Sequence, residues 1–406
     1  TPISTVSNPI ATTPTPAVVI TPQNSSLTLT LWTVEDVSAL AQNEEAAAFL
    51  TEVVSTFESE NPDFKVNVLV KKTSGKGGVL DFLRTSRDVA PSVLPDVVVM
   101  DATDLNPAYI DGLVESLDGR LDRAIVQDLL PAARRVGTVD GKLVGVPLGL
   151  KMEHAVYNMA MFSEAPITWT QVLSSNTHYL FPAKGINGLV NDTTLAQYFS
   201  AGGEFVGEDG RPKIDDRVLT SVLKFYETAL SKGIIDATLL DASTTEDLWP
   251  TYLAGKAGVA QLSVSQYLID RDKLRNSSVT GLPVPTAANT QVSVMHARVM
   301  ALVTDDPVRQ DAALKLIAAM LSTQNNAAWN EINKSIPVRD TSFQQLAGSD
   351  PYWQFLTSLL NTARPEPRLS GYDRIGRILQ QALEQVIRGE ASAEEATSTA
   401  VDALAQ

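Results

Sequence analysis

The stretch that decides the fold is Asp140-Gly-Lys-Leu-Val-Gly-Val-Pro-Leu148, which continues through Lys151-Met-Glu-His154 to Val156-Tyr-Asn158. A turn led by glycine feeds a short apolar strand, a second strand leaves it, and charged residues lie between the two. A chain that crosses from one lobe to another, and presents side chains to the gap between them, has this pattern. The segment therefore predicts a two-lobed protein with polar groups at the crossover.

Length and composition agree with two lobes and exclude several classes of partner. The 406 residues exceed the size at which one hydrophobic core usually suffices. Hydrophobic residues make up 44% of the chain, but no apolar run approaches the roughly 18 residues of a membrane-spanning helix. The net charge is −15, from 32 Lys and Arg against 47 Asp and Glu. Because this charge repels phosphate backbones, we expect no nucleic-acid partner.

The residue types and motifs of most enzymes are missing from this chain. It has no cysteine, which excludes disulfides, thiolate metal sites and cysteine nucleophiles. Its three histidines, His154, His178 and His296, are far apart in the sequence. None of the patterns HExxH, GxxxxGK(S/T), GxSxG or GxGxxG occurs. We therefore expect neither an enzyme nor a cofactor or metal site.

Residues 1–26 have the composition of a flexible tether. They contain no Asp, Glu, Lys or Arg and are rich in Thr, Ser and Pro. Such a segment buries too little apolar surface to fold, and proline keeps it extended. In bacterial lipoproteins a tether of this kind follows the acylated cysteine, so we expect a lipid anchor on the outer face of the cytoplasmic membrane. The alternative is a disordered leader without lipid.

From Leu27 onward, strand and helix patterns alternate, which is typical of an α/β fold with mainly parallel sheets. Asn43 is expected to cap a helix that ends before Asn61-Pro62. The clearest helix is 372–388, in which apolar residues recur every three to four positions. The other predicted elements are strands at 27–32, 64–70, 94–100 and 292–303, and helices at 168–173, 193–200, 215–232, 309–321 and 325–332.

A series of short motifs spans nearly everything from Leu27 to the C-terminus. The series comprises a first strand ending in Trp32, Phe57-Glu-Ser-Glu-Asn-Pro62, Pro95-Asp96, the crossover at 140–158, Thr168-Trp169, Gly202-Gly203, Gly255-Lys256-Ala257, Leu282-Pro283, Ile336-Pro-Val-Arg339 and Gly389-Glu-Ala-Ser-Ala-Glu-Glu-Ala396. Taken in this order, the motifs resemble those of extracytoplasmic solute-binding proteins of the maltose-binding-protein-like family, which feed ABC importers. Each motif is weak alone, and the series carries the resemblance.

The resemblance implies a type II periplasmic-binding-protein-like fold of two α/β lobes with a solute held between them. The first lobe would comprise 27–148 and 290–338, and the second 149–289 and 339–406. Hinges are expected near 149–153, 287–292 and 337–342. The implied protein is an extracytoplasmic monomer that captures a small solute, first of all a sugar or oligosaccharide. It closes about its hinges and docks on an ABC permease without chemistry on the solute.

Candidate ligand contacts in the first lobe follow from the rule that ligands bind beyond the carboxyl ends of strands in open α/β sheets. Trp32 offers a flat face for stacking on a sugar ring, and Asp101 can accept hydroxyl hydrogens. Core packing is the alternative for Trp32, and helix capping for Asp101. The resemblance adds Glu35 and Asp36 to the candidate contacts, and the alternative for both is a solvated loop carboxylate. The predicted contacts are Trp32, Glu35, Asp36, Met100, Asp101 and Thr103.

Candidate contacts at the crossover and in the second lobe rest on the resemblance. Lys151 is nearest to the position of a ligand-binding carboxylate in the family. Asn191 and Asp192 precede a helix at which the family adds polar contacts, although capping is their alternative. The predicted contacts are Lys151, Glu153, His154, Asn191, Asp192, Trp249, Ser263, Ser265, Tyr372 and Arg377.

The chain departs from its sugar-binding relatives at two positions. Ser265 and Gly376 stand where those relatives carry stacking aromatic residues, and Trp249 and Tyr372 are candidate replacements with core packing as their alternative. Four arginines could instead favour a carboxylate or phosphate. They are Arg298, Arg339, Arg374 and Arg377. The alternatives to sugar capture are thus another polar or anionic solute, a secreted carbohydrate-active hydrolase with paired carboxylates, or an adhesion or sensory module.

Overall fold

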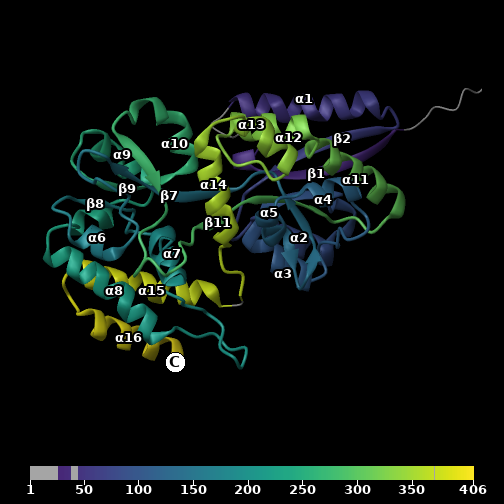
Figure 1. The fold of residues 1–406 in the computed structure, drawn as a ribbon. Coiled ribbons are helices and arrows are strands. Elements are labelled where there is room, and N and C mark those ends of the chain that lie inside the picture. Colours follow the sequence, from purple (N-terminus) through teal and green to yellow (C-terminus); the bar gives the residue numbers. More distant parts are fainter. Residues whose placement is uncertain (1–25, 38–43, 370) are drawn as a thin grey trace, which may run out of the picture.

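The computed structural model describes residues 26–37, 44–369 and 371–406, which form two lobes lying side by side (Figure 1). Each lobe has its own sheet and its own large cluster of buried apolar side chains. This confirms the predicted α/β fold with two lobes. The predicted tether lies almost entirely outside the described residues, and so does the expected helix cap at Asn43.

The sheet of the first lobe brings the ends of β1 and β3 to one edge. Its order is β2 (Phe64–Lys71), β1 (Leu27–Val34), β3 (Val97–Asp101), β12 (Arg298–Leu302) and β6 (Gly145–Pro147). β1 is parallel to β2 and β3, whereas β12 is antiparallel to β3 and β6. The carboxyl end of β3 therefore meets the start of β12, and Asp101 pairs in register with Arg298.

The quoted stretch carries the chain between the sheets as predicted. β4 (Thr138–Val139) and β5 (Lys142–Leu143) form a hairpin. Its two turn residues, Asp140 and Gly141, both have positive φ, which suits the right-handed twist of the flanking strands. After β6 in the first sheet the chain passes Gly149 and enters the second sheet as β7 (Lys151–Asn158).

The sheet of the second lobe is built around β7. Its order is β13 (Arg364–Pro365), β11 (Val294–His296), β7, β9 (Val259–Ser263) and β8 (Tyr179–Leu180), and β10 (Ser277–Thr280) also pairs with β7. β7 is antiparallel to β9, β10 and β11. The chain leaves this sheet at His296 and enters the first sheet at Arg298. A single residue, Ala297, thus separates the two sheets at this second crossing.

Nine helices surround the first sheet within the described part of the chain. They are α1 (Glu44–Glu60), α2 (Val79–Val89), α3 (Leu105–Ile110), α4 (Arg123–Asp128), α5 (Pro131–Gly137), α11 (Pro307–Met320), α12 (Thr323–Ile332), α13 (Asp340–Ala347) and α14 (Pro351–Thr362). α1 ends before Asn61-Pro62, as predicted. α14 lies between the lobes in Figure 1, and Trp353 and Leu356 belong to the first core. The predicted division had placed 339–406 in the second lobe.

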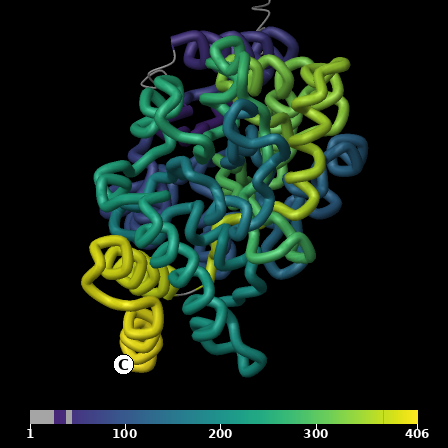
Figure 2. Tube along the Cα trace, turned by 60° about the vertical axis from the view of Figure 1, so that its left-hand side comes forward, coloured from purple at the N-terminus to yellow at the C-terminus, as the bar shows by residue number. Residues whose placement is uncertain are grey.

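The helices of the second lobe include the two at the C-terminus. They are α6 (Trp169–Leu173), α7 (Asp192–Ser200), α8 (Asp216–Ser231), α9 (Thr245–Leu253), α10 (Val264–Asp270), α15 (Tyr372–Ile387) and α16 (Ala393–Ala405). Figure 2 shows α15 and α16, in yellow, at the opposite end of the molecule from α1, in purple. Short 3-10 turns are η1 (Glu35–Val37), η2 (Pro91–Val93), η3 (Ala102–Asp104), η4 (Ala237–Asp241) and η5 (Arg271–Lys273). Within 26–37, 44–369 and 371–406, no helix is both long and apolar enough to span a bilayer.

Candidate functional site

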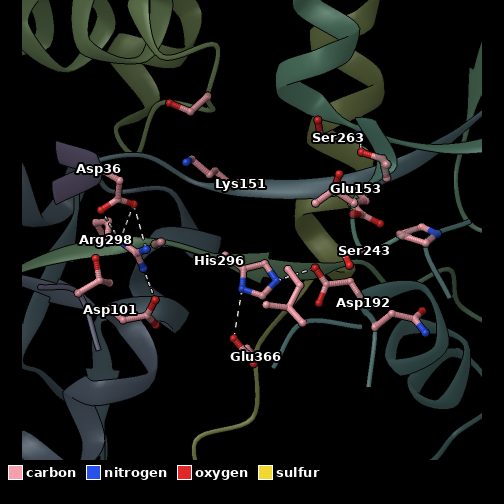
Figure 3. A pocket seen from close by; sticks show the side chains of 18 of the residues that line it. Asp36, Asp101, Lys151, Glu153, Asp192, Ser243, Ser263, His296, Arg298 and Glu366 are labelled. Carbon is pink, nitrogen blue, oxygen red and sulfur yellow. Dashed lines mark hydrogen bonds and ion pairs between the residues drawn. The ribbon is translucent and has the colours of Figure 1, made fainter. Parts of the chain in front are cut away.

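A cavity of about 510 Å³ lies where the two sheets meet. This volume is in the range of small-molecule sites, about 300–1,000 Å³. Its lining includes η1, which follows β1, the end of β3, the crossing segments at 148–153 and 296–298, and the loops before α7 and α9. Polar side chains project into it from both lobes (Figure 3). The cavity therefore has two walls, which differ in how their charges are paired.

One wall, the arginine wall, consists of Asp36, Asp101 and Arg298. The Arg298 guanidinium donates to Asp36 Oδ2 at 2.9 Å and also pairs with Asp101. Thr103 donates to Asp101 Oδ1 through its amide at 2.8 Å and its hydroxyl at 2.7 Å. Burial alone would raise the pKa of Asp101, but Arg298 and Thr103 outweigh it and hold the pKa below its usual value. Asp101 is thus charged, and both carboxyl groups of this wall already have partners.

The other wall is built on β7 and its neighbours. Side chains two residues apart on a strand share a face, so Lys151 and Glu153 both point into the cavity, whereas Met152 and His154 are buried on the opposite face. In register with them across the ladder stand His296 on β11 and Ser263 on β9. Asp192, Glu246 and Glu366 complete this surface, which we call the acidic wall.

His296 connects three segments that are distant in the sequence. Its Nε2 lies 2.7 Å from Asp192 Oδ2 at the start of α7, and its Nδ1 lies 3.2 Å from Glu366 Oε2 after β13 (Figure 3). Removal from water would lower the pKa of His296, but these two carboxylates raise it well above the ordinary histidine value. His296 is therefore a cation whose two N–H groups are both engaged.

Glu153 is the least satisfied group of the acidic wall. Its Oε2 is buried and has no hydrogen-bond partner among the described residues. Burial, together with repulsion from Asp192 and Glu246, raises its pKa to about 8. The Thr193 hydroxyl and the charge of His296 oppose this shift but do not cancel it, and Glu153 is one of the residues that line the cavity.

The helices around the acidic wall begin at residues that also line the cavity. Asn191 caps α7 by accepting from the amide of Thr194 at 2.9 Å. Ser263 caps α10 by accepting from the amide of Gln266 at 3.1 Å, and its hydroxyl donates to Glu246 Oε1 at 2.7 Å. Capping and cavity lining, which the sequence posed as alternatives, thus coexist at Asn191, as they do at Asp101, which caps η3.

Seven of the sixteen predicted contact residues line the cavity. They are Asp36, Asp101, Lys151, Glu153, Asn191, Asp192 and Ser263. Ligand contact by these residues stays a prediction. The other nine do not line the cavity, and the structure gives most of them other surroundings. They are Trp32, Glu35, Met100, Thr103, His154, Trp249, Ser265, Tyr372 and Arg377.

The predicted aromatic platforms lie in the cores. Trp32 is 2% exposed, meets Phe82 edge to face, and has the Lys71 ammonium 4.5 Å from its ring centre. Trp249 donates to Asp270 at 2.7 Å and stacks on a neighbouring tyrosine. Tyr372 is buried 5.9 Å from the ring of Phe205. Core packing, the alternative weighed from the sequence, describes all three, because each ring finds partners inside its own lobe.

His154 is also a core residue. It is fully buried, its Nδ1 donates to the carbonyl of Ala155 at 3.0 Å, and its Nε2 accepts from the hydroxyl of Tyr352 on α14 at 2.9 Å. Burial lowers the pKa of His154 to about 4, so the ring is neutral. The neutral imidazole fits this pair of partners, one acceptor and one donor, and joins the second lobe to α14.

The remaining predicted contacts fall into three kinds. Met100 is fully buried in β3, and the Thr103 hydroxyl donates a hydrogen bond to Asp101. Glu35 is exposed in η1. Ser265 lies inside α10, and Arg377 pairs with Asp373 one turn away at 3.6 Å. At Gly376 a Cβ would lie 3.1 Å from a side-chain carbon of Leu189, in the loop that lines the cavity, so the leucine would have to shift slightly to admit a side chain.

Sequence reasoning missed several residues that the structure brings to the cavity. They are Glu246, His296, Trp329 and Glu366, and Arg298 was considered only as part of an anion site. Trp329 is the one tryptophan, tyrosine or phenylalanine among the described lining residues. A usable signal existed for two of them, since His296 and Arg298 interrupt a mainly apolar strand region at 292–303. No group of three or more metal-binding side chains is found in the described ranges.

Comparisons with known proteins agree with this architecture. The sequence model of the family described as bacterial extracellular solute-binding protein matches residues 52–354. A protein of Brucella abortus (strain 2308), described as a binding protein, is 20% identical over 361 residues, or 84% of this chain and 85% of the relative.

Among solved structures, the cyclic α-maltosyl-1,6-maltose binding protein of Arthrobacter globiformis superposes with a TM-score of 0.74 at 18% identity, covering 93% of this chain and 98% of that one. The sugar-binding protein MalE of Xanthomonas citri gives a TM-score of 0.74 at 18% identity, covering 93% and 96%. At this level of identity the likeness shows a shared fold.

Proposed function

The chain belongs to the bacterial extracellular solute-binding protein family, and on that premise we propose that it is the substrate-binding component of an ABC importer. It captures a hydroxyl-rich solute, a sugar or short oligosaccharide, in the cavity between its lobes. The descriptions of the structural neighbours, a cyclic α-maltosyl-1,6-maltose binding protein and a sugar-binding protein, support this class of ligand.

The observation that carries the proposal is the polar lining of a cavity shared by both lobes. Asp36 and Asp101 on the arginine wall, and Asp192 and Glu246 on the acidic wall, offer carboxylate oxygens. A carboxylate only accepts hydrogen bonds, so it pairs well with sugar hydroxyls. Trp329, a largely buried residue of the first core, is the aromatic side chain among the described lining residues.

Capture proceeds by closure of the lobes about the crossing segments. A solute that contacts both walls favours the arrangement in which the walls are close, and so shifts the population toward the closed state. Closure excludes water, which strengthens each polar contact. The closed surface then reports occupancy to the permease, and the solute leaves unchanged.

The test is a titration with a panel of sugars and oligosaccharides, read by calorimetry, thermal shift and small-angle scattering. A solute at 100 times its Kd stabilises the folded state by about 2.7 kcal/mol and reduces the radius of gyration. The double variant Asp192→Asn, Glu246→Gln loses binding, whereas the surface change Glu164→Gln keeps it. Failure of the whole panel to bind or to close the lobes would overturn the proposal.

Two further parts of the proposal have their own measurements. Labelled glycans incubated with the protein are recovered intact, and any hydrolysis product would favour the hydrolase alternative. The protein acts outside the cytoplasm, held by a lipid at the end of the 1–26 tether. Mass spectrometry of the intact native protein should show the additional mass of the lipid, and a native mass without this addition would rule out the anchor.

A further inference from the structure

The cavity has an excess of acidic groups. Among the described lining residues, six side chains carry a carboxyl group and three carry a basic group. The carboxyl groups belong to Asp36, Asp101, Glu153, Asp192, Glu246 and Glu366, and the basic groups to Lys151, His296 and Arg298. Two of the three cations are already paired, because Arg298 holds two carboxylates and His296 holds two more. The cavity is therefore set up to receive positive charge or hydrogen-bond donors.

An anionic solute finds few partners here. Of the four arginines that the sequence offered for an anion, only Arg298 lines the cavity. Arg339 pairs with Asp128 at 2.7 Å, Arg374 donates to a backbone carbonyl at 2.6 Å, and Arg377 pairs with its own helix. The structure does not assemble the four guanidinium groups into one site.

Glu153 marks the place within the cavity where a cation fits. In Figure 3 it lies at the end of the cavity formed by Ser243, Asp192 and Ser263, and Lys151 lies toward Asp36. Along β7, Lys151 and Glu153 are two positions apart, or about 6–7 Å. Oε2 of Glu153 has no hydrogen-bond partner within the described part of the chain, and among the charged neighbours of Glu153 the carboxylates Asp192 and Glu246 accompany one cation, His296, which Asp192 and Glu366 already pair.

We propose that the solute carries a protonated amino group, and that Glu153 receives this group between Asp192 and Glu246. The inference rests on the proposed function and narrows its ligand class to amino sugars or oligosaccharides that contain one. The ammonium group donates to the carboxyl group of Glu153, and the hydroxyl groups of the solute donate to the remaining carboxylates of both walls.

A proton is released when the amino group binds. The groups that face Glu153 are Asp192 from α7, Glu246 from α9, His296 from β11 and Lys151 from β7 itself. Near pH 7 the raised pKa of Glu153 keeps this carboxyl group mostly protonated in the empty cavity. A bound ammonium favours the carboxylate, so Glu153 gives up about one proton per solute to the buffer.

The experiment compares the binding of matched solutes to the full-length chain. The probes are D-glucosamine, D-glucose, N-acetyl-D-glucosamine and D-glucuronate. The β-1,4-linked and α-1,4-linked disaccharides of these sugars are tested where they exist. Putrescine serves as an amine without a sugar. Calorimetry at pH 7 in two buffers of different ionisation enthalpy gives both affinity and proton release. We expect the amine-bearing sugar to bind tightest and to release about one proton.

Two variants make the result specific to Glu153. Glu153→Gln weakens the amine-bearing sugar about 10- to 100-fold and abolishes proton release, because a charge-assisted hydrogen bond is lost. Binding of a neutral sugar stays within about threefold, since glutamine keeps an acceptor. Glu164→Gln, an exposed carboxyl group outside the cavity, changes neither quantity.

The outcomes separate this inference from the proposed function. Neutral sugars binding as tightly as their amines, with no effect of Glu153→Gln, would overturn the inference and leave sugar capture intact. Tightest binding of glucuronate would do the same. Binding of putrescine without any sugar would support the amino site and contradict the sugar class, and binding of no probe would contradict both.

Discussion

The two walls of the cavity both carry carboxyl groups, but they differ in how completely those groups are paired with cations and hydrogen-bond donors. On the arginine wall, one guanidinium neutralises Asp36 and Asp101, and Thr103 satisfies a further oxygen. On the acidic wall, four carboxyl groups share His296 and the exposed Lys151, and one oxygen of Glu153 has no partner among the described residues. The carboxylates of the first wall are partnered within the protein, whereas the second wall keeps this unpartnered oxygen next to the place where we propose that the solute binds.

This difference teaches which wall fixes the site and which wall selects the solute. A satisfied ion pair holds its side chains in one geometry, so the arginine wall offers fixed acceptors to any hydroxyl-rich solute. An unsatisfied buried carboxyl group costs stability in the empty protein, and a solute with the right donor removes that cost. Selectivity should therefore come from the acidic wall.

The largest expected effect on the free energy of unfolding comes from removing the cation of the arginine wall. Arg298→Met leaves Asp36 and Asp101 without their cation, and breaking a buried pair costs about 3–5 kcal/mol. These side chains are 25% to 40% exposed, so we expect a loss of about 2–3 kcal/mol in the free energy of unfolding, measured in urea at pH 7. Arg211→Met, at an exposed pair, stays within about 0.5 kcal/mol. A loss for Arg298→Met no larger than this control would refute the description of the wall.

The second prediction has the opposite sign and concerns Glu153. Because the pKa of Glu153 is raised to about 8, the folded state binds a proton that the unfolded state has lost, and stability falls as pH rises from 4.5 to 8. Glu153→Gln lacks this fall, so at pH 9 the variant is more stable than the parent by about 2 kcal/mol. Urea unfolding at pH 5, 7 and 9 checks it, and a variant less stable than the parent at pH 9 would contradict the prediction.

A smaller effect is expected at His296. Its pKa is raised by Asp192 and Glu366, so its stabilising contribution is fully present below about pH 6.5 and is lost as pH rises through the folded-state pKa. The side chain is 36% exposed, and solvent screening limits the contribution to about 1 kcal/mol. His296→Gln should therefore be less stable at pH 6 and approach the parent at high pH. An equal deficit at every pH would show that charge is not the cause.

The smallest effect tests whether a cavity residue also supports the fold. Ser263→Ala removes the cap of α10 and the donor to Glu246, so we expect a loss of about 0.5–1 kcal/mol in unfolding free energy. Ser265→Ala, two residues further along the same helix, is the matched control and should change less. Equal effects of the two substitutions would mean that the cap contributes little.

The sequence predicted the elements whose signal is local. The apolar stripe of α15, the run of buried residues in β3, and the Asp140-Gly141 turn each depend on a few neighbouring residues. α14 also has local signals, with Asp350 at its cap and Pro351 at its first turn, but its place on the first core depends on contacts made across the molecule. Pattern alone does not fix such contacts.

The site was predicted in part for the same reason. The strand-end rule and the family resemblance led to Asp101 and Glu153, which line the cavity, but they also led to Trp32 and His154, which point into the cores. Successive side chains on a strand point to opposite faces, so Glu153 lines the cavity while its neighbour His154 is buried in the core. His296 joins Asp192 and Glu366 across more than a hundred and seventy positions of the chain, and only the fold brings them together.

The most direct test of the central claim is a crystal structure of the protein with its tightest solute from the panel. The account predicts one solute molecule in the cavity, with contacts both to the arginine wall at Asp36 or Asp101 and to the acidic wall at Glu153. A solute bound elsewhere on the protein, or bound to one wall while the lobes stay apart, would contradict it.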